Sequence, residues 1–207
     1  MARRLVYLGL VLAVLAMLTG GTAMAADEKG WVQLFNGKDL TGWKTHPDDK
    51  AKWEVKDGIL IGSGPVGHLF SERGDYENFH YRIEAQINEG GNSGQYFRTE
   101  FGKSFPKGYE AQINSTHRDP QRTGSLYGIV KIMDQLHKPN EWFTQEVIAM
   151  GNHIIIKVND KTVVDFKDPQ NRYTKGHFAL QQHDPGTVVK FRKIEVKELP
   201  PTKKEGK

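Results

Sequence analysis

The stretch from Asn78 to Asn88 alternates between apolar and polar residues without a break. Its apolar positions are Phe79, Tyr81, Ile83, Ala85 and Ile87, and the polar positions between them are His80, Arg82, Glu84 and Gln86. Successive side chains of a β-strand point to opposite faces, so this period of two predicts a strand with one buried and one polar face. A helix repeats every 3.6 residues and cannot follow this pattern.

Most of the chain after Gly30 has the same character. Strand-like segments are separated by glycine, asparagine and aspartate, which favour tight turns. The predicted strands cover residues 53–55, 59–61, 78–88, 95–100, 109–114, 145–150, 154–158, 161–166, 176–183 and 188–199. In the last of these the apolar phase changes between Phe191 and Ile194, which indicates a β-bulge. We find no convincing amphipathic helix, so these short strands predict an all-β sandwich or barrel.

The first 25 residues have the order of a secretory signal peptide. Arg3 and Arg4 precede an apolar run from Leu5 to Leu18, and small residues up to Ala25 suit a cleavage site. An uncleaved anchor is the weaker alternative, because the run is short for a membrane span and charged residues follow it at once. We expect residues 30–199 to form a single domain and residues 200–207 a disordered charged tail.

Composition narrows the compartment and the partners. The chain has no cysteine, and export without disulfides indicates a bacterial protein that is secreted or periplasmic, with no stable membrane anchor after signal cleavage. Lys and Arg number 29 against 25 Asp and Glu, and loss of the signal removes two arginines, so the mature net charge is about +2. Nucleic-acid-binding domains are far more basic, so we expect no nucleic-acid partner.

The segment GGNSGQYFRTE, residues 90–100, raises the question of function. A strand here would place Tyr96, Arg98 and Glu100 on one face. The next predicted strand has Glu110 and Gln112 on one face, and the connection between the two is short. We therefore expect antiparallel neighbours, with Arg98 close to Glu110 or Gln112 across the ladder.

Such a polar row has two interpretations. It can be a solvated outer face whose ion pairs contribute about 0 to 1 kcal/mol each, or the floor of a concave sugar site that presents donors and acceptors to hydroxyl groups. Composition alone favours the first. These faces carry no lysine, however, and glycines at 90, 91 and 94 permit close approach of a ligand. Of eight histidines, His117 and His183 stand out because each follows or ends a polar strand face.

Six motifs occur in order and resemble one known family. They are LFNGKDLTGW at 34–43, WEVKDG at 53–58, GNSGQYFR at 91–98, GYEAQI at 108–113, GSLYG at 124–128 and LQQH at 180–183. Together they are similar to the bacterial 3-keto-disaccharide hydrolase domain family, over about residues 31–199. The resemblance implies a concanavalin-like jelly-roll β-sandwich of two antiparallel sheets, with the binding site on the concave face. It also implies an exported protein acting on glycosides already oxidised to a ketone at carbon 3.

The family motifs mark site residues in this chain. They fall on Asn92, Ser93, Gly94 and Arg98, on Gly108, Tyr109, Glu110 and Gln112, and on Leu180, Gln181 and His183. Two positions depart from the pattern. Gln95 stands where many members have a hydrophobic residue, and Asp184 follows the histidine where many have glycine.

The implied substrate suggests an elimination. A ketone at carbon 3 acidifies the hydrogen on carbon 2, so a base can remove it and the glycosidic oxygen can leave before water adds to the enone. Ordinary glycoside hydrolysis needs two carboxylates that flank the bond. We expect His117 or His183 to be the base and Arg98 to hold the enolate oxygen. Glu110 is expected to orient a histidine or to ligate a divalent cation.

The substrate-binding residues that we expect are Asn92, Ser93, Tyr96, Glu100, Gln112, Tyr127 and Gln181. Glu100 could equally lie on the rim of the site. The main alternative is a carbohydrate-binding module without catalysis, since the same fold carries lectins. A protein adaptor would need an exposed apolar patch that the sequence does not show. The residues leave open which sugar is bound and whether a metal takes part.

Overall fold

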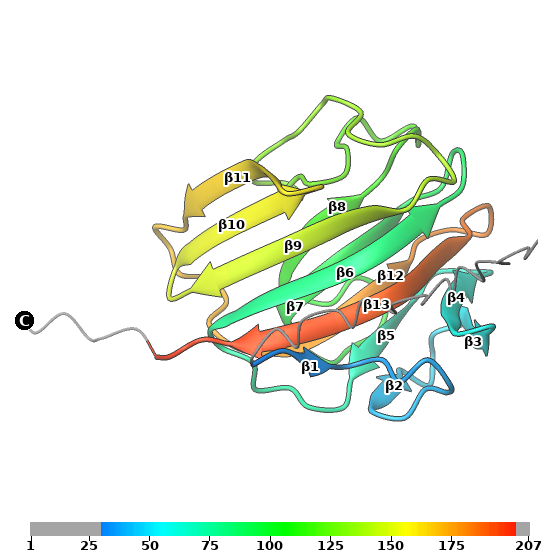
Figure 1. The fold of residues 1–207 in the computed structure, drawn as a ribbon, viewed down its shortest axis with the longest axis horizontal. Coiled ribbons are helices and arrows are strands. Elements are labelled where there is room, and N and C mark those ends of the chain that lie inside the picture. The colour runs from blue at the N-terminus through cyan, green and yellow to red at the C-terminus, as the bar shows by residue number, and fades with distance from the viewer. Residues whose placement is uncertain (1–29, 202–207) are drawn as a thin grey trace, which may run out of the picture.

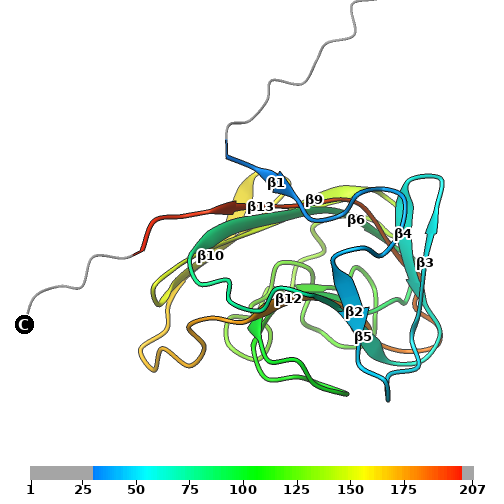
Figure 2. The same ribbon diagram turned by 90° about the horizontal axis from the view of Figure 1, so that it is seen from below.

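The structure, a computed structural model, describes residues 30–201. These residues form two antiparallel sheets packed face to face (Figures 1 and 2). The predicted signal peptide and residues 202–207 of the predicted tail lie outside the described residues. Within residues 30–201 there is no helix long and apolar enough to cross a membrane. The all-β prediction is confirmed.

The larger sheet has the strand order β11-β10-β9-β6-β13-β4-β3, and β1 also pairs with β13. Its strands are β1 Val32–Gln33, β3 Lys52–Lys56, β4 Ile59–Ser63, β6 Phe79–Ile87, β9 Phe143–Met150, β10 His153–Val158, β11 Lys161–Lys167 and β13 Val189–Glu198. The smaller sheet has the order β2-β5-β12-β7-β8. Its strands are β2 Trp43–Thr45, β5 Gly67–Ser71, β7 Ser93–Thr99, β8 Tyr109–Ile113 and β12 His177–Gln182.

The core lies between the two sheets, and β6 forms much of it. The apolar residues of β6 are at most 1% exposed, as its alternation predicts. Across the gap Phe178 of β12 stacks on Tyr81 of β6, with ring centroids 4.0 Å apart. Because each strand alternates, burying one face of β7, β8 and β12 in this core leaves their other side chains on the outer face of the smaller sheet. That outer face carries the candidate site.

Two local features predicted from the sequence, a hairpin turn and a β-bulge, are confirmed. The turn between β3 and β4 has Asp57 and Gly58 at φ values of 51° and 77°, the left-handed conformation that a two-residue hairpin turn requires. In β13 the pairing register with β6 shifts between Phe191 and Lys193. This is the bulge that the change of apolar phase indicated.

A second β-bulge, in β7, was not predicted. Against β12, residue His177 pairs with Thr99 but Ala179 pairs with Tyr96, so β7 has one extra residue between these pairs. Arg98 occupies this bulge with a φ of 49°. The bulge reverses the alternation of side chains beyond Tyr96, so the prediction that Tyr96, Arg98 and Glu100 share one face is wrong.

Candidate functional site

A pocket of about 330 Å³ lies on the outer face of the smaller sheet, over β7, β8 and β12. It is lined by Asn92, Tyr96, Phe105, Glu110, Gln112, Tyr127, Gln181 and His183. All of these except Phe105 are among the residues expected from the sequence. The pairing register explains why they meet, because Tyr96 of β7 pairs with Glu110 of β8 on one side and with Ala179 of β12 on the other.

Glu110 lies in the pocket above Gly94. A β-carbon at position 94 would lie 2.3 Å from the Oε1 atom of Glu110, so only glycine leaves room for the carboxyl group. The hydroxyl of Tyr96 hydrogen-bonds to this carboxyl. With its amide nitrogen facing the acceptors, Gln112 donates to Glu110 Oε1 over 3.1 Å and to the carbonyl of Ser93 over 2.8 Å. Three strand residues thus fix the position of the carboxyl.

Burial raises the pKa of Glu110 to about 8. The hydrogen bond from Tyr96 opposes this effect, and the negative charge of Asp119 adds to it. A carboxyl with a pKa near 8 is mostly protonated at neutral pH, so it can donate a proton there. Catalytic carboxyl groups are often tuned to this range, whereas an ordinary surface glutamate is ionised.

His183 and His117 lie side by side at one end of the pocket, with ring centroids 5.8 Å apart. Between them is Asp184, whose Oδ2 atom lies 3.1 Å from His183 Nδ1 and 3.5 Å from His117 Nε2. Asn92 contacts the second histidine, with 3.3 Å between its Nδ2 atom and His117 Nδ1. Burial lowers the pKa of His117, and the charge of Asp184 opposes this shift. The structure therefore brings both predicted histidines to the site, although only His183 lines the pocket.

Two amide oxygens in the pocket have no partner among the residues that the structure describes. Gln181 donates its amide nitrogen to the hydroxyl of Tyr96 over 3.1 Å. Its Oε1 atom, and the Oδ1 atom of Asn92, are buried and accept no hydrogen bond from residues 30–201. Buried polar atoms are nearly always paired in folded proteins, so these two acceptors are suited to the hydroxyl groups of a ligand.

Arg98 does not face the pocket, and its predicted role is wrong. Its side chain is 1% exposed and donates to the backbone carbonyls of Glu77, Gly151 and Tyr173 over 2.6 to 3.2 Å. The bulge in β7 turns it toward these loops, with its guanidinium 5.8 Å from the ring centre of Phe79. Tyr96, rather than Arg98, is the residue opposite Glu110. Arg98 is therefore a structural residue of the fold.

Two further predicted contacts are not found in the pocket. Ser93 is fully buried and its hydroxyl donates to the carbonyl of Gln181 over 2.6 Å, so it links β7 to β12. Glu100 is exposed beyond the bulge, and its backbone nitrogen donates to the carbonyl of Lys107. Neither side chain lines the pocket.

Two aromatic residues at the pocket are open to solvent. Phe105, in the loop between β7 and β8, is 63% exposed, and its ring centre lies 5.8 Å from that of His183. Tyr127 is 41% exposed and donates its hydroxyl to Asp119 over 2.8 Å. Sequence reasoning missed Phe105 because alternation carries no information in a loop. An exposed aromatic ring beside a polar pocket is suited to stack on the apolar face of a sugar.

His68 of β5 also escaped the sequence analysis. Its ring is fully buried and packs edge-on against Tyr96, with 5.0 Å between ring centres. Burial, and to a lesser extent the charge of His183, lowers the pKa of His68 to about 3. His68 is therefore neutral at physiological pH and supports the wall behind Tyr96.

The residues present do not form a metal centre. Across residues 30–201 no group of three or more His, Asp or Glu side chains is arranged to hold a metal ion. His46, which lies near two aspartates in sequence, forms a turn in which the backbone nitrogen of Asp49 donates to its carbonyl. Glu110 therefore lacks, among residues 30–201, the further His, Asp or Glu ligands that a divalent cation would need.

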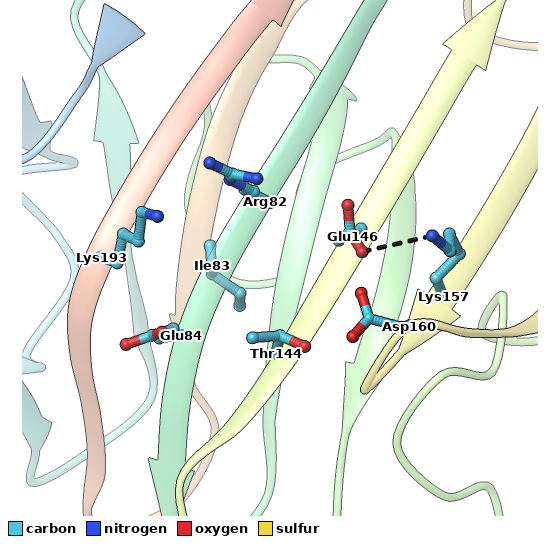
Figure 3. A pocket seen from close by; sticks show the side chains of 8 residues that line it. All are labelled: Arg82, Ile83, Glu84, Thr144, Glu146, Lys157, Asp160 and Lys193. Atoms are coloured by element: carbon cyan, nitrogen blue, oxygen red, sulfur yellow. Dashed lines mark ion pairs between the residues drawn. The ribbon is translucent and has the colours of Figure 1, made fainter. Parts of the chain in front are cut away.

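A second pocket, of about 160 Å³, lies on the outer face of the larger sheet and is lined by charges of both signs (Figure 3). Glu146 pairs with Lys157 over 3.7 Å, as the dashed line shows, and Lys193 pairs with Glu195 over 3.1 Å. Arg82 also pairs with Glu195. The polar strand face of this sheet is thus a network of ion pairs, as the sequence allowed, but the carboxylates of Glu146 and Glu195 are buried rather than solvated.

Two antiparallel sheets around an apolar core, with a polar pocket on the outer face of the smaller sheet, define a concanavalin-like jelly-roll β-sandwich with a candidate ligand site. The family described as the 3-keto-alpha-glucoside-1,2-lyase-like domain matches residues 30–197. The chain belongs to this family, which confirms the resemblance carried by its six motifs.

Known relatives agree with this assignment. The curated 3-keto-disaccharide hydrolase of Bacteroides thetaiotaomicron is 24% identical over 175 residues, covering 69% of this chain, and the chain spans 60% of that protein's length. A crystal structure from Parabacteroides distasonis, provisionally assigned as a glycosyl hydrolase, is 25% identical with a TM-score of 0.71, covering 83% of this chain and 94% of that one. The carbohydrate-binding module CBM66 of Bacillus subtilis, 18% identical, shares the fold with a TM-score of 0.57, covering 76% and 96%.

Proposed function

We propose that this chain is an exported bacterial hydrolase that cleaves glycosides carrying a ketone at carbon 3, by elimination followed by hydration. Family membership and the curated relative support the substrate class. The observation that carries the mechanism is the pairing of residues in one pocket. Glu110 has a pKa raised to about 8, and His183 is a second titratable group that lines the same pocket. Two titratable groups in unlike environments suit an acid and a base.

The reaction needs a base, an acid and water. The base removes the proton from carbon 2, which the neighbouring ketone has acidified. The electron pair forms the double bond between carbons 1 and 2 as the bond from carbon 1 to the glycosidic oxygen breaks, and that oxygen takes a proton from the acid. Water then adds to carbon 1 of the enone and carbon 2 regains a proton. The net result is hydrolysis, without the oxocarbenium-like transition state of ordinary glycosidases.

In this chain we assign His183 as the base and Glu110 as the acid. His183 lines the pocket, whereas the alternative base, His117, has its Nδ1 atom occupied by Asn92 and by the backbone nitrogen of Asp119. Glu110 carries the proton that the leaving oxygen needs, because its carboxyl is mostly protonated at neutral pH.

The developing enolate requires donors other than Arg98, which is turned away. The neutral donors that remain in the pocket are the second N–H groups of the Asn92 and Gln181 amides, because the hydroxyl of Tyr96 and both N–H groups of Gln112 already have acceptors. Preorganised neutral donors stabilise a developing oxyanion when they are held in place and shielded from water. The bond from Gln181 to the hydroxyl of Tyr96 and the contact of Asn92 with His117 hold these two amides in place.

A carbohydrate-binding module is the competing proposal. Binding alone would use the two free amide oxygens and the exposed aromatic rings, but it has no need of a carboxyl whose pKa is raised to about 8. A carboxyl tuned to titrate near neutral pH is typical of a catalytic acid or base. The raised pKa of Glu110 therefore favours catalysis.

The test is release of the leaving sugar from a 3-keto-disaccharide and from its unoxidised parent, with purified mature protein. We expect release from the keto sugar alone, and loss of release in Glu110→Gln. The matched control is Glu100→Gln, which removes an exposed carboxylate outside the pocket and is expected to behave as wild type. Saturable binding of either sugar without release would instead establish the binding module.

A further inference from the structure

Asp184 directly follows His183, and its two carboxylate oxygens have different partners. Oδ1 accepts hydrogen bonds from the backbone nitrogen of Gly186 over 3.2 Å and from the hydroxyl of Thr187 over 3.3 Å. These bonds fix the turn between β12 and β13. Oδ2 takes no part in the turn and faces His183 Nδ1 at 3.1 Å and His117 Nε2 at 3.5 Å. The carboxylate is thus held by one oxygen and presents the other to two imidazole rings.

The tautomer of His117 follows from its neighbours. Its Nδ1 atom accepts a hydrogen bond from the backbone nitrogen of Asp119 over 3.1 Å, and it also faces the amide nitrogen of Asn92 at 3.3 Å. Both of these groups are donors, so Nδ1 carries no proton. The proton of the neutral ring is therefore on Nε2, which points it at Asp184 Oδ2.

The same reasoning applies to His183. An ionised aspartate only accepts hydrogen bonds, so the ring nitrogen facing Oδ2 must be protonated. In neutral His183 that nitrogen is Nδ1, which leaves Nε2 with a free lone pair. Because the ring lines the pocket, the unprotonated nitrogen is the one available to a ligand there.

We propose that Asp184 is a positioning residue that holds His183 as the Nδ1–H tautomer, so that its Nε2 atom can accept a proton in the pocket. In catalytic triads, a carboxylate that accepts a hydrogen bond from Nδ1 of the histidine keeps that base in one tautomer. The catalytic part of the inference rests on the proposed function, but the tautomer does not. Asp184 is also one of the two positions at which the chain departs from the pattern of many family members.

The most informative variant is Asp184→Asn. Asparagine keeps an oxygen for Gly186 and Thr187, so the turn is preserved. The amide nitrogen then replaces Oδ2 and donates to His183 Nδ1, which reverses the hydrogen bond and moves the ring proton to Nε2. The matched control is Asp165→Asn, because Asp165 Oδ1 bonds His153 Nε2 at 2.6 Å on the other sheet, away from the pocket.

The experiment is histidine side-chain nitrogen NMR of the full mature chain at pH 8 without ligand. We expect His183 to be Nδ1–H in wild type and in Asp165→Asn, and Nε2–H in Asp184→Asn, with the thermal midpoint of all three within a few degrees. An Nε2–H signal in wild type, or an unchanged tautomer in Asp184→Asn, would overturn the proposal.

Turnover of the 3-keto-disaccharide gives the second measurement. We expect kcat of Asp184→Asn to fall by about 10²-fold while KM changes less than twofold, because a wrong tautomer impairs proton transfer and not binding. If the tautomers behave as expected but wild type cleaves no keto sugar, the proposed function fails and the positioning of His183 stands. If wild type is active and Asp184→Asn retains full kcat, Asp184 has no positioning role in catalysis.

Discussion

The raised pKa of Glu110 predicts that this carboxyl makes stability depend on pH. In an unfolded chain a glutamate titrates near 4.3, whereas burial raises the pKa of Glu110 in the folded chain to about 8. The folded state therefore holds the proton more tightly, and its stabilising effect is complete below the unfolded pKa. As pH rises toward 8, the unfolded chain releases the proton first, so the free energy of unfolding falls.

The size of the effect follows from these two values. Between pH 5 and pH 9 the difference in proton binding lowers the free energy of unfolding by about 4 kcal/mol. Because the carboxyl faces a pocket open to solvent, screening reduces this figure, and we expect a loss of about 2 to 4 kcal/mol. Glu110→Gln is neutral at every pH and keeps an oxygen for the hydroxyl of Tyr96, so it should lack this loss.

The assay is urea unfolding of wild type, Glu110→Gln and the control Glu100→Gln at pH 5, 7 and 9. Subtracting the two glutamine variants removes the contribution of every titrating group except Glu110 and Glu100, and comparison of the control with wild type gives the contribution of Glu100. We expect the stability of Glu110→Gln relative to the control to increase steadily with pH. A difference that stays constant within about 0.5 kcal/mol from pH 5 to pH 9 would refute the reasoning that Glu110 is protonated at neutral pH.

Three other predictions follow from the site and its surroundings. Gly94→Ala places a β-carbon 2.3 Å from Glu110 Oε1, so displacement of the carboxyl should lower kcat for the keto sugar at least tenfold; a variant with unchanged kcat would contradict the placement of Glu110. Arg98→Met leaves three backbone carbonyls without their donor and should reduce the free energy of unfolding, measured in urea, by about 3 to 5 kcal/mol. The kcat of the folded fraction should not change. A loss of kcat without a loss of stability would show that Arg98 acts in the site. Phe105→Ala removes the exposed ring beside His183 and should raise KM for a 3-keto-disaccharide by about fivefold. Equal KM values for the variant and wild type would exclude Phe105 as a sugar platform.

The sequence predicted the parts of the structure that depend on strict alternation. The two-residue period of a strand predicted three features: the apolar face of β6, the outward-facing side chains of β8 and the bulge in β13. Seven of the eight pocket residues were expected, some from strand parity and others from the motifs. The strand β5 was not predicted, since all five of its residues are buried and no alternation marks it.

The remaining features depend on contacts between distant segments. Arg98 was placed on the wrong face because one inserted residue in β7 reverses parity, and a positive φ at a non-glycine residue has no local sequence signal. The raised pKa of Glu110 depends on how far the surrounding strands and loops exclude water. The contact of Asp184 with His117 joins a loop to a turn 67 positions later in the chain, which no local pattern can show.

The central claim is that cleavage proceeds by removal of the proton from carbon 2, and isotopic labelling at that carbon tests it most directly. A 3-keto-disaccharide carrying deuterium at carbon 2 of the keto ring is incubated with the mature protein in ordinary water, beside an enzyme-free sample that measures spontaneous exchange. We expect the released keto sugar to have lost its deuterium. The unreacted disaccharide should lose deuterium no faster than it does in the enzyme-free sample. Release of a keto sugar that still carries the deuterium would show direct hydrolysis at carbon 1 and would contradict the account.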